Sequence, residues 1–302
     1  VYAYMPSAVL TQTGAGSITN LANPQYGVVN AVDGTQPVPH QYYNDGRITT
    51  QNVYFGNAWH TVLVGTTGRG PAKAIYALDI TDPTVLMDPS KAKNALLWER
   101  SAGDGKTGSN YIGEITGTPV IAQIKQGGTT SWAVFVGNGY NSAANTPALL
   151  QFDLQTGSLS VHTAGTTAND GLAEPGLMQS NTADGISTYA FAGDLNGNLW
   201  KFDLSSSTSA GTVAFIAKDP SGNTQPITSL VSIAYDSTTN STFALFGTGK
   251  YLTQDDIKDK QVQTWYGVRV GMGADLAGAT STTNPVASSS TPRADLTQRY
   301  AF

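Results

Sequence analysis

Short stretches in which hydrophobic and polar residues alternate dominate this 302-residue chain. One unit occurs four times: an apolar stretch leads into a glycine, a gap rich in Gly and Asn follows, and a second apolar stretch comes next. Alternation with a period of two is typical of half-buried β-strands. The repeated unit therefore predicts hairpins, with strands near residues 62–65, 74–79, 133–137, 148–153, 189–193, 198–203, 243–247 and 264–270.

The glycines that anchor the four units are Gly65, Gly137, Gly193 and Gly247, which lie 72, 56 and 54 residues apart. Such spacing suits propeller blades with loop insertions. A hairpin cannot bury both of its faces alone, so the copies must stack. We therefore expect an all-β propeller with about four recognisable blades, and a ring that is incomplete or closed in an unusual way. Each anchor glycine is expected to allow close packing near the axis.

In other segments the alternation of apolar and polar residues is less regular, and the predictions there rest on it less firmly. Further strands are expected at residues 1–10, at 53–64 on either side of a turn, and at 95–99, 118–124, 213–217 and 227–235, with one helical turn at 255–260. Asn196 and Gly197 predict a two-residue type I′ hairpin turn. We expect a propeller domain over 1–270 that is a fragment of a longer protein. Residues 271–302, rich in Gly, Ala, Ser and Thr, are expected to form a flexible tail.

Composition narrows the class of protein. Charged residues make up 12% of the chain, the net charge is −5, and no basic stripe is present, which argues against nucleic acid as a partner. Cysteine is absent, which excludes disulfides and thiolate chemistry. No apolar run approaches the roughly 20 residues of a membrane-spanning helix. The chain starts at Val1 rather than Met, so we expect a processed or truncated piece of an exported protein.

Catalytic motifs are incomplete throughout. Two Gly-Lys stretches resemble phosphate loops but fail at Arg100 and Tyr251, and no Gly-x-Ser-x-Gly elbow occurs. The three histidines are far apart and lack metal-binding spacing. Aspartates end three equivalent strands, at positions 79, 153 and 203, which favours a role in accepting backbone N–H bonds from the following turns. Four of the five tryptophans, at positions 98, 132, 200 and 265, are expected to pack between blades.

One loop suits a contact surface. Asn138, Tyr140 and Asn141 follow the second anchor glycine within a Gly-rich run. Polar loops that contain tyrosine make good contacts with little entropy to lose. These three residues are the candidate contact patch, with an ordinary loop as the alternative.

The run AGDLNGNLWKFDL at 192–204 resembles the signature of the PilY/PilC family of type IV pilus tip adhesins and assembly factors. Six further runs resemble that family in the same order: YMPSAVL at 4–10, HTVLVG at 60–65, IYALDITDP at 75–83, VGNGYNS at 136–142, GTGKYL at 247–252 and QTWYG at 263–267. The resemblance covers roughly residues 1–270 and implies a C-terminal β-propeller. The N-terminal region of the family, often with a von Willebrand A-like domain, is not in this chain.

The chain departs from the family at a calcium loop. Many members carry Asp-x-Asp-x-Asp-Gly-x-x-Asp before the AGD hairpin, where this chain has SNTADGIST at 180–188. Calcium needs six to eight oxygen ligands, usually several of them carboxylates. Asp184 supplies one carboxylate, and Ser180, Thr182 and Thr188 supply hydroxyls. We therefore expect no tight calcium site and no other cofactor, with these four residues as the only candidate ligands.

The resemblance implies a non-enzymatic module for type IV pilus biogenesis and adhesion. Its implied partners are minor pilins of the pilus tip complex and a host or abiotic surface, with no nucleic acid. Its implied location is the pilus tip, the outer membrane or the cell surface after passage through the periplasm. Two alternatives stay open: a quinoprotein-type propeller dehydrogenase, which needs a quinone pocket with a metal and an aspartate base, and a propeller scaffold for other assemblies.

Overall fold

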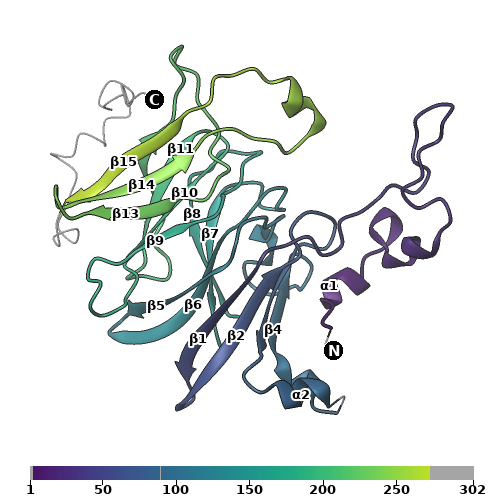
Figure 1. Ribbon diagram of the computed structural model, residues 1–302, viewed down its shortest axis with the longest axis horizontal. Coiled ribbons are helices and arrows are strands. Elements are labelled where there is room, and N and C mark those ends of the chain that lie inside the picture. The colour runs from purple at the N-terminus through teal and green to yellow at the C-terminus, as the bar shows by residue number, and fades with distance from the viewer. Residues whose placement is uncertain (1–2, 89, 273–302) are drawn as a thin grey trace.

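Four antiparallel sheets, arranged as a fan, form the body of the molecule (Figure 1). The computed structural model describes residues 3–88 and 90–272. Blade 1 holds β1 (Ile48–Phe55), β2 (Ala58–Thr66), β3 (Ala74–Asp79) and β4 (Leu96–Ser101), and blade 2 holds β5 (Val120–Gln126), β6 (Thr129–Gly137), β7 (Ala148–Asp153) and β8 (Leu159–Thr163). Blade 3 holds β9 (Gly176–Met178), β10 (Tyr189–Gly193), β11 (Asn198–Asp203) and β12 (Thr212–Ile216), and blade 4 holds β13 (Ser232–Asp236), β14 (Ser241–Gly247) and β15 (Trp265–Met272).

The predicted propeller of four blades is confirmed, and its sheets do not close into a ring. Strands pair in chain order within every blade. Four predicted strands, at 74–79, 148–153, 189–193 and 198–203, match β3, β7, β10 and β11 in both bounds. The predicted tail lies, from residue 273, outside the described residues.

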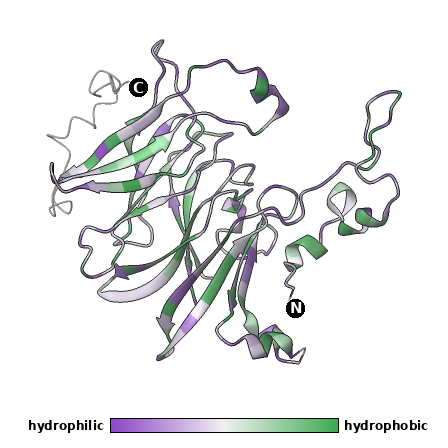
Figure 2. Ribbon diagram, in the orientation of Figure 1, coloured by the Kyte–Doolittle hydropathy of each residue, from purple (hydrophilic) through white to green (hydrophobic). Residues whose placement is uncertain are grey.

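The cores of the molecule lie between neighbouring blades. Three clusters of buried side chains join blade 1 to blade 2, blade 2 to blade 3 and blade 3 to blade 4. Hydrophobic positions concentrate on the strands and hydrophilic ones along the loops (Figure 2). No buried cluster of the described part joins blade 4 to blade 1. The fan is therefore held by three shared cores and is open on one side.

The prediction of a strand at residues 1–10 was wrong for the described part of that segment. Helix α1 (Ser7–Leu10) forms there instead, because the Glu99 carboxylate of β4 accepts bonds from its first N–H groups, those of Ser7 and Ala8, at 2.9 and 3.0 Å. A carboxylate at a helix N-terminus stabilises the unpaired N–H groups there. The Ser7 hydroxyl donates to the same side chain at 2.7 Å. The N-terminal segment is thus docked on blade 1.

The remaining helical elements are short. They are η1 (Gly14–Gly16), η2 (Ile18–Ala22), α2 (Pro83–Met87), η3 (Ala92–Ala95), η4 (Ser109–Tyr111) and η5 (Gln254–Lys258). The helical turn expected at 255–260 corresponds to η5 and begins one residue earlier. The strand predicted at 227–235 begins only at Ser232, and Ile227 instead makes a single bridge to Gly249.

The hairpin turns are of different types, and the sequence did not predict which type occurs where. Gly56 and Asn57 both have positive φ, at 57° and 64°, and join β1 to β2 as a two-residue type I′ turn. The same turn type was predicted at Asn196 and Gly197, which was wrong because only Gly197 has positive φ. Asp194 instead accepts the N–H groups of residues 196 and 198, which closes a three-residue loop.

Aspartates at strand ends act as predicted. The Asp79, Asp153 and Asp203 carboxylates each accept the N–H of the residue two positions later, at 3.0, 3.1 and 2.9 Å. Their recurrence therefore has a structural cause. The Nδ1–H of His60 donates to the Asp79 carboxylate at 2.7 Å, and its ring stacks on Phe55.

The four tryptophans predicted to pack between blades differ in burial. Trp98 is buried between blades 1 and 2, where its indole N–H donates to the Leu154 carbonyl at 2.8 Å, and Trp200 is buried in the core between blades 2 and 3. Trp132 is partly buried and packs against the core between blades 1 and 2. Trp265 is 70% exposed, so the prediction that it packs between blades was wrong.

The four anchor glycines differ in how much room a side chain would have at their positions. A Cβ built on Gly137 would lie 2.0 Å from the carbonyl oxygen of Ala173, and one built on Gly193 would lie 2.2 Å from the side chain of Ile227. Ala173 and Ile227 lie in the segments that lead into the next blade, so these two glycines permit close approach between successive repeats. A Cβ on Gly65 would meet Tyr76 of the adjacent strand, and one on Gly247 would meet nothing within 4 Å.

Replacing Gly137 by alanine should therefore destabilise the protein, because a backbone carbonyl cannot give way as a flexible side chain can. We expect Gly137→Ala to lower the free energy of unfolding by at least about 2 kcal/mol. Gly247→Ala is the matched control and should change it by less than about 0.5 kcal/mol. Urea unfolding followed by circular dichroism measures both. Equal effects at the two positions would contradict the assignment.

Candidate functional site

Loops from all four blades surround a cleft with a volume of about 240 Å³. Its walls come from the loops that follow β2, precede β5, join β6 to β7, β8 to β9, β10 to β11, and β14 to β15. The lining residues are Arg69, Glu114, Tyr140, Asn141, Asn145, Asn169, Asp170, Leu195, Lys250, Leu252, Thr253 and Asp256. Since no single blade builds it, the cleft exists only when the blades are assembled.

Three asparagines of the cleft have left-handed backbones. Asn141, Asn145 and Asn169 each have φ of 57°. Asparagine tolerates this region better than other residues with a Cβ. The side-chain amide of Asn141 donates to Glu114 Oε1 at 2.9 Å, and that of Asn145 donates to Asn169 Oδ1 at 3.2 Å. The result is a group of neighbouring amides and one carboxylate at the cleft wall.

The predicted contact patch is only partly at the surface. Asn138 is completely buried, and its Oδ1 accepts the N–H groups of Ala148 and Leu172, both at 3.0 Å. Its expected role in contacting a partner is therefore wrong, because every polar atom of its amide lies inside the protein. Tyr140 is 7% exposed and lines the cleft together with the exposed Asn141. Two of the three predicted residues are thus brought to one site.

Two buried carboxylates lie at the cleft: Asp170 is part of its lining, and Asp194 precedes the lining residue Leu195. Asp170 accepts the N–H groups of Gly171 and Leu195 at 2.7 and 2.8 Å and the Asn196 amide at 2.5 Å. Asp194 accepts the indole N–H of Trp200 at 2.7 Å, together with the turn N–H groups already described. Burial, and then the charge of Asp194, raise the pKa of Asp170 to about 6. The two carboxylates hold neighbouring loops of the same blade in place. Their oxygens accept bonds from N–H donors of the protein and are therefore not free.

Burial also raises the pKa of Tyr140, with the negative charges of Asp170 and Asp194 as further causes. The Tyr140 hydroxyl consequently remains protonated at any physiological pH. It makes no hydrogen bond within residues 3–88 and 90–272 and lines the cleft. It is therefore an available O–H donor.

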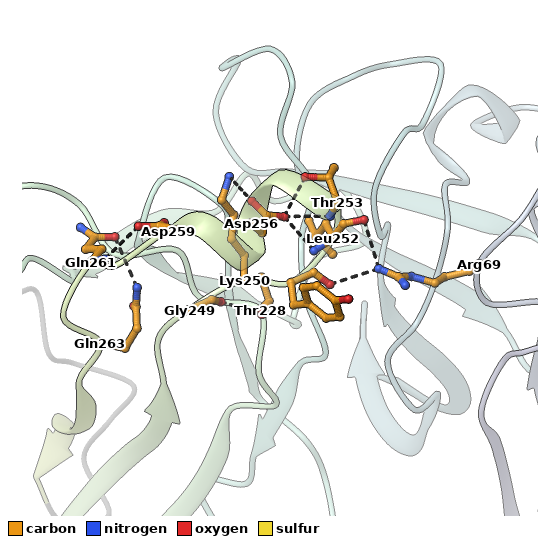
Figure 3. Close-up of polar contacts among 11 residues, drawn as sticks. Arg69, Thr228, Gly249, Lys250, Leu252, Thr253, Asp256, Asp259, Gln261 and Gln263 are labelled. Atoms are coloured by element: carbon orange, nitrogen blue, oxygen red, sulfur yellow. Dashed lines mark hydrogen bonds and ion pairs between the residues drawn. The ribbon is translucent and has the colours of Figure 1, made fainter. Parts of the chain in front are cut away.

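The open side of the fan is spanned by Arg69 (Figure 3). From the loop after β2, its guanidinium donates to the carbonyl oxygens of Tyr251 and Leu252 at 3.1 and 3.3 Å. Asp256 shapes that acceptor loop by accepting the N–H groups of Leu252 and Thr253 at 2.9 and 2.8 Å. Those bonds, and an ion pair of 3.2 Å with Lys250, hold the pKa of Asp256 far below its usual range. Blade 1 and blade 4 thus meet at the cleft through Arg69.

The four candidate calcium ligands are only partly gathered. The Ser180 and Thr188 hydroxyls lie 2.7 Å apart, whereas Asp184 Oδ1 accepts the Ile186 N–H at 2.9 Å and Thr182 is exposed on the same turn. Within the described ranges, no three His, Asp or Glu side chains gather as a metal site. The expectation that this turn binds no calcium tightly stays a prediction.

Most residues that line the cleft were not predicted from the sequence. Arg69, Asn145, Asn169, Asp170 and Lys250 were not singled out. A signal was available, because each anchor glycine is followed two to four residues later by a lining residue: Arg69, Tyr140, Asn141, Leu195 and Lys250. Equivalent loops of stacked repeats emerge at the same end of the molecule.

The chain is similar to proteins named as type IV pilus biogenesis factors. The family model for the PilY1 beta-propeller domain matches residues 1–288. A type IV pilus biogenesis factor PilY1 homolog of Xylella fastidiosa is 36% identical over 244 residues, which are 80% of this chain and 18% of that protein. Type IV pilus biogenesis factor PilY1 of Pseudomonas aeruginosa is 35% identical over 263 residues, covering 78% of this chain and 21% of that protein. The chain spans about a fifth of the length of these relatives.

One solved structure has a similar fold. The crystal structure of the Pseudomonas aeruginosa PilY1 C-terminal domain matches 82% of this chain and 51% of its own length, with a TM-score of 0.62 and 32% identity. The match supports the propeller fold over most of the described residues.

The raised pKa of Asp170 predicts a pH dependence. The folded protein holds this proton more tightly than the unfolded chain, where the pKa is near 3.8, so the stability it contributes is complete below about pH 4 and is lost as pH rises through about 6. Asp170→Asn does not titrate. Its free energy of unfolding, relative to wild type, should therefore rise by about 2 kcal/mol from pH 4 to pH 7. Urea unfolding at several pH values measures the difference, and a flat or falling difference would contradict it.

Proposed function

The chain belongs to the PilY1 β-propeller family, and from that premise we propose that it is a non-enzymatic module for type IV pilus biogenesis and adhesion. The observation that carries the proposal is the match of the PilY1 propeller family to nearly the whole chain. In this proposal the module binds minor pilins of the pilus tip complex, a host or abiotic surface, or both. It acts after export, at the pilus tip, the outer membrane or the cell surface.

The fold supports a binding role. A propeller is a rigid scaffold that displays loops at its ends. Here the loops of four blades meet around one cleft, and their backbones are fixed by buried bonds such as those of Asn138 and Asp170. A surface that is already ordered loses little entropy when a partner binds. No helix among the described residues is both long and apolar enough to cross a membrane.

The chemistry of the cleft favours binding over acid–base catalysis. A general base needs a free lone pair within reach of the substrate proton. Asp170 and the neighbouring Asp194 have their oxygens turned to N–H donors, Glu114 accepts the Asn141 amide, and Asp256 is held by Lys250 and two backbone N–H groups. We propose that the module needs no metal or organic cofactor, including at the turn that contains Asp184.

Deletion of the gene should reduce the number of surface pili, adhesion and twitching motility, because the proposed module takes part in building the pilus tip. Pili are counted by electron microscopy and sheared-pilin blots, and expression of the intact gene from a plasmid should restore them. Normal piliation and adhesion in the deletion strain would refute the proposal. Quinone-dependent alcohol oxidation by the purified protein would favour the dehydrogenase alternative instead.

A further inference from the structure

The cleft lining holds two cations, Arg69 and Lys250, and three carboxyl groups, those of Glu114, Asp170 and Asp256. Lys250 pairs with Asp256 at 3.2 Å, and Nη2 of the Arg69 guanidinium donates to two backbone carbonyls, which leave its charge in place. Because the carboxylates at least balance the cations near neutral pH, the cleft offers an anionic ligand no net positive charge. The cleft therefore does not favour a phosphate or a carboxylate.

Hydrogen-bonding groups without a full set of partners line the same cleft. The Tyr140 hydroxyl has no partner in the described part of the chain. The side-chain oxygens of Asn141 and Asn145 and the side-chain nitrogen of Asn169 form no hydrogen bond with described residues, whereas the other end of each amide is bonded. One-sided bonding fixes an amide and leaves its second group for a ligand. Together these groups offer both donors and acceptors to a ligand in the cleft.

Part of the cleft lining is apolar. The half-buried side chains of Leu195 and Leu252 line the cleft with Tyr140. A volume of about 240 Å³ is below the roughly 300–1,000 Å³ of sites that enclose drug-sized ligands. The ligand group that fits is small, has an apolar face, and carries neutral donors and acceptors around its edge.

We propose that this cleft binds one ring of a neutral, hydroxyl-rich carbohydrate. The ring would lay its C–H face on Leu195 and Leu252 and direct its hydroxyls to Tyr140, Asn145 and Asn169. A hydroxyl both donates and accepts, so it can satisfy an amide nitrogen and an amide oxygen alike. This inference rests on the proposed adhesive function and names the chemical class of the surface ligand.

A peptide is the less suitable occupant. Peptide recognition uses an exposed sheet edge, an apolar groove for a helix, or a lined groove for a proline-rich segment. The cleft is built from loops, and its apolar lining is limited to two leucines and one tyrosine. A short peptide is therefore included in the test as a competitor.

The left-handed backbones of Asn145 and Asn169 allow their side chains to be removed without backbone strain. Glycine adopts positive φ at no steric cost, so Asn145→Gly and Asn169→Gly remove the amides and keep the loop conformation. Tyr140→Phe removes only the hydroxyl. Asn57→Gly is the matched control, since Asn57 also has positive φ, at 64°, and lies in the β1–β2 turn away from the cleft lining.

The test is isothermal titration calorimetry and saturation-transfer NMR on the purified 302-residue chain. The ligands are methyl glycosides of glucose, mannose and galactose, N-acetylglucosamine, the anionic sialic acid, the cationic glucosamine, and a Gly-Ser-Asn-Gly peptide. We expect at least one neutral sugar to bind. The double variant Asn145→Gly/Asn169→Gly should weaken that binding by about tenfold or more and Tyr140→Phe by about three- to tenfold, with Asn57→Gly unchanged.

Three results would overturn the inference: no binding of any neutral sugar, equal binding by the double variant, or tighter binding of a charged sugar or the peptide. None of them affects the proposed function, which the deletion strain tests by its piliation. If both hold, a strain that carries the double variant should keep its pili and lose sugar-inhibitable adhesion.

Discussion

One buried amide, that of Asn138, joins the loops of blades 2 and 3 on which the cleft depends. Its oxygen accepts the N–H of Ala148 within blade 2 and that of Leu172 on the way to blade 3, and its nitrogen donates to the Thr146 carbonyl at 2.9 Å. A buried group left without its partner costs about 1–3 kcal/mol. Because Gly137 has no side chain, the Leu172 and Ala173 backbone can come close enough for these bonds. The loops that carry Tyr140 and Asn169 are fixed as a result.

The other side of the cleft is held differently. Between blades 1 and 4 no buried cluster of the described part exists, and the contact is made by the Arg69 guanidinium and two carbonyl groups. Arginine suits this task because its planar head presents several N–H donors at once. The loops between blades 2 and 3 therefore rest on well-packed blades, whereas the 249–256 loop is tied to blade 1 by hydrogen bonds that water can reach. These two sets of loops should differ in mobility, with the 249–256 loop as the less stable part.

The repeat was predictable because it is local. A period of two, an anchor glycine and a terminal aspartate recur within short windows, so β3, β7, β10 and β11 could be placed to the residue. What failed depended on distant partners. Asn138 looked like an exposed loop residue because nothing nearby in sequence shows that Leu172 reaches it. Residues 1–10 were predicted as a strand, yet Ser7–Leu10 form a helix because Glu99, some 90 residues away, accepts the N–H groups of its first turn. The cleft itself combines six loops, and only the equivalence of the loops after each anchor glycine hinted at it.

The central claim, that a cleft built by four blades is closed at its open side by Arg69, is tested most directly by hydrogen exchange in Arg69→Ala. The matched control is Arg47→Ala, which removes an exposed arginine side chain with no partner among the described residues. Amide exchange followed by mass spectrometry should accelerate at residues 249–256 in Arg69→Ala, while the strands of blades 1, 2 and 3 keep the protection of wild type. Unchanged exchange at 249–256, or an equal loss of protection in all blades, would contradict the account.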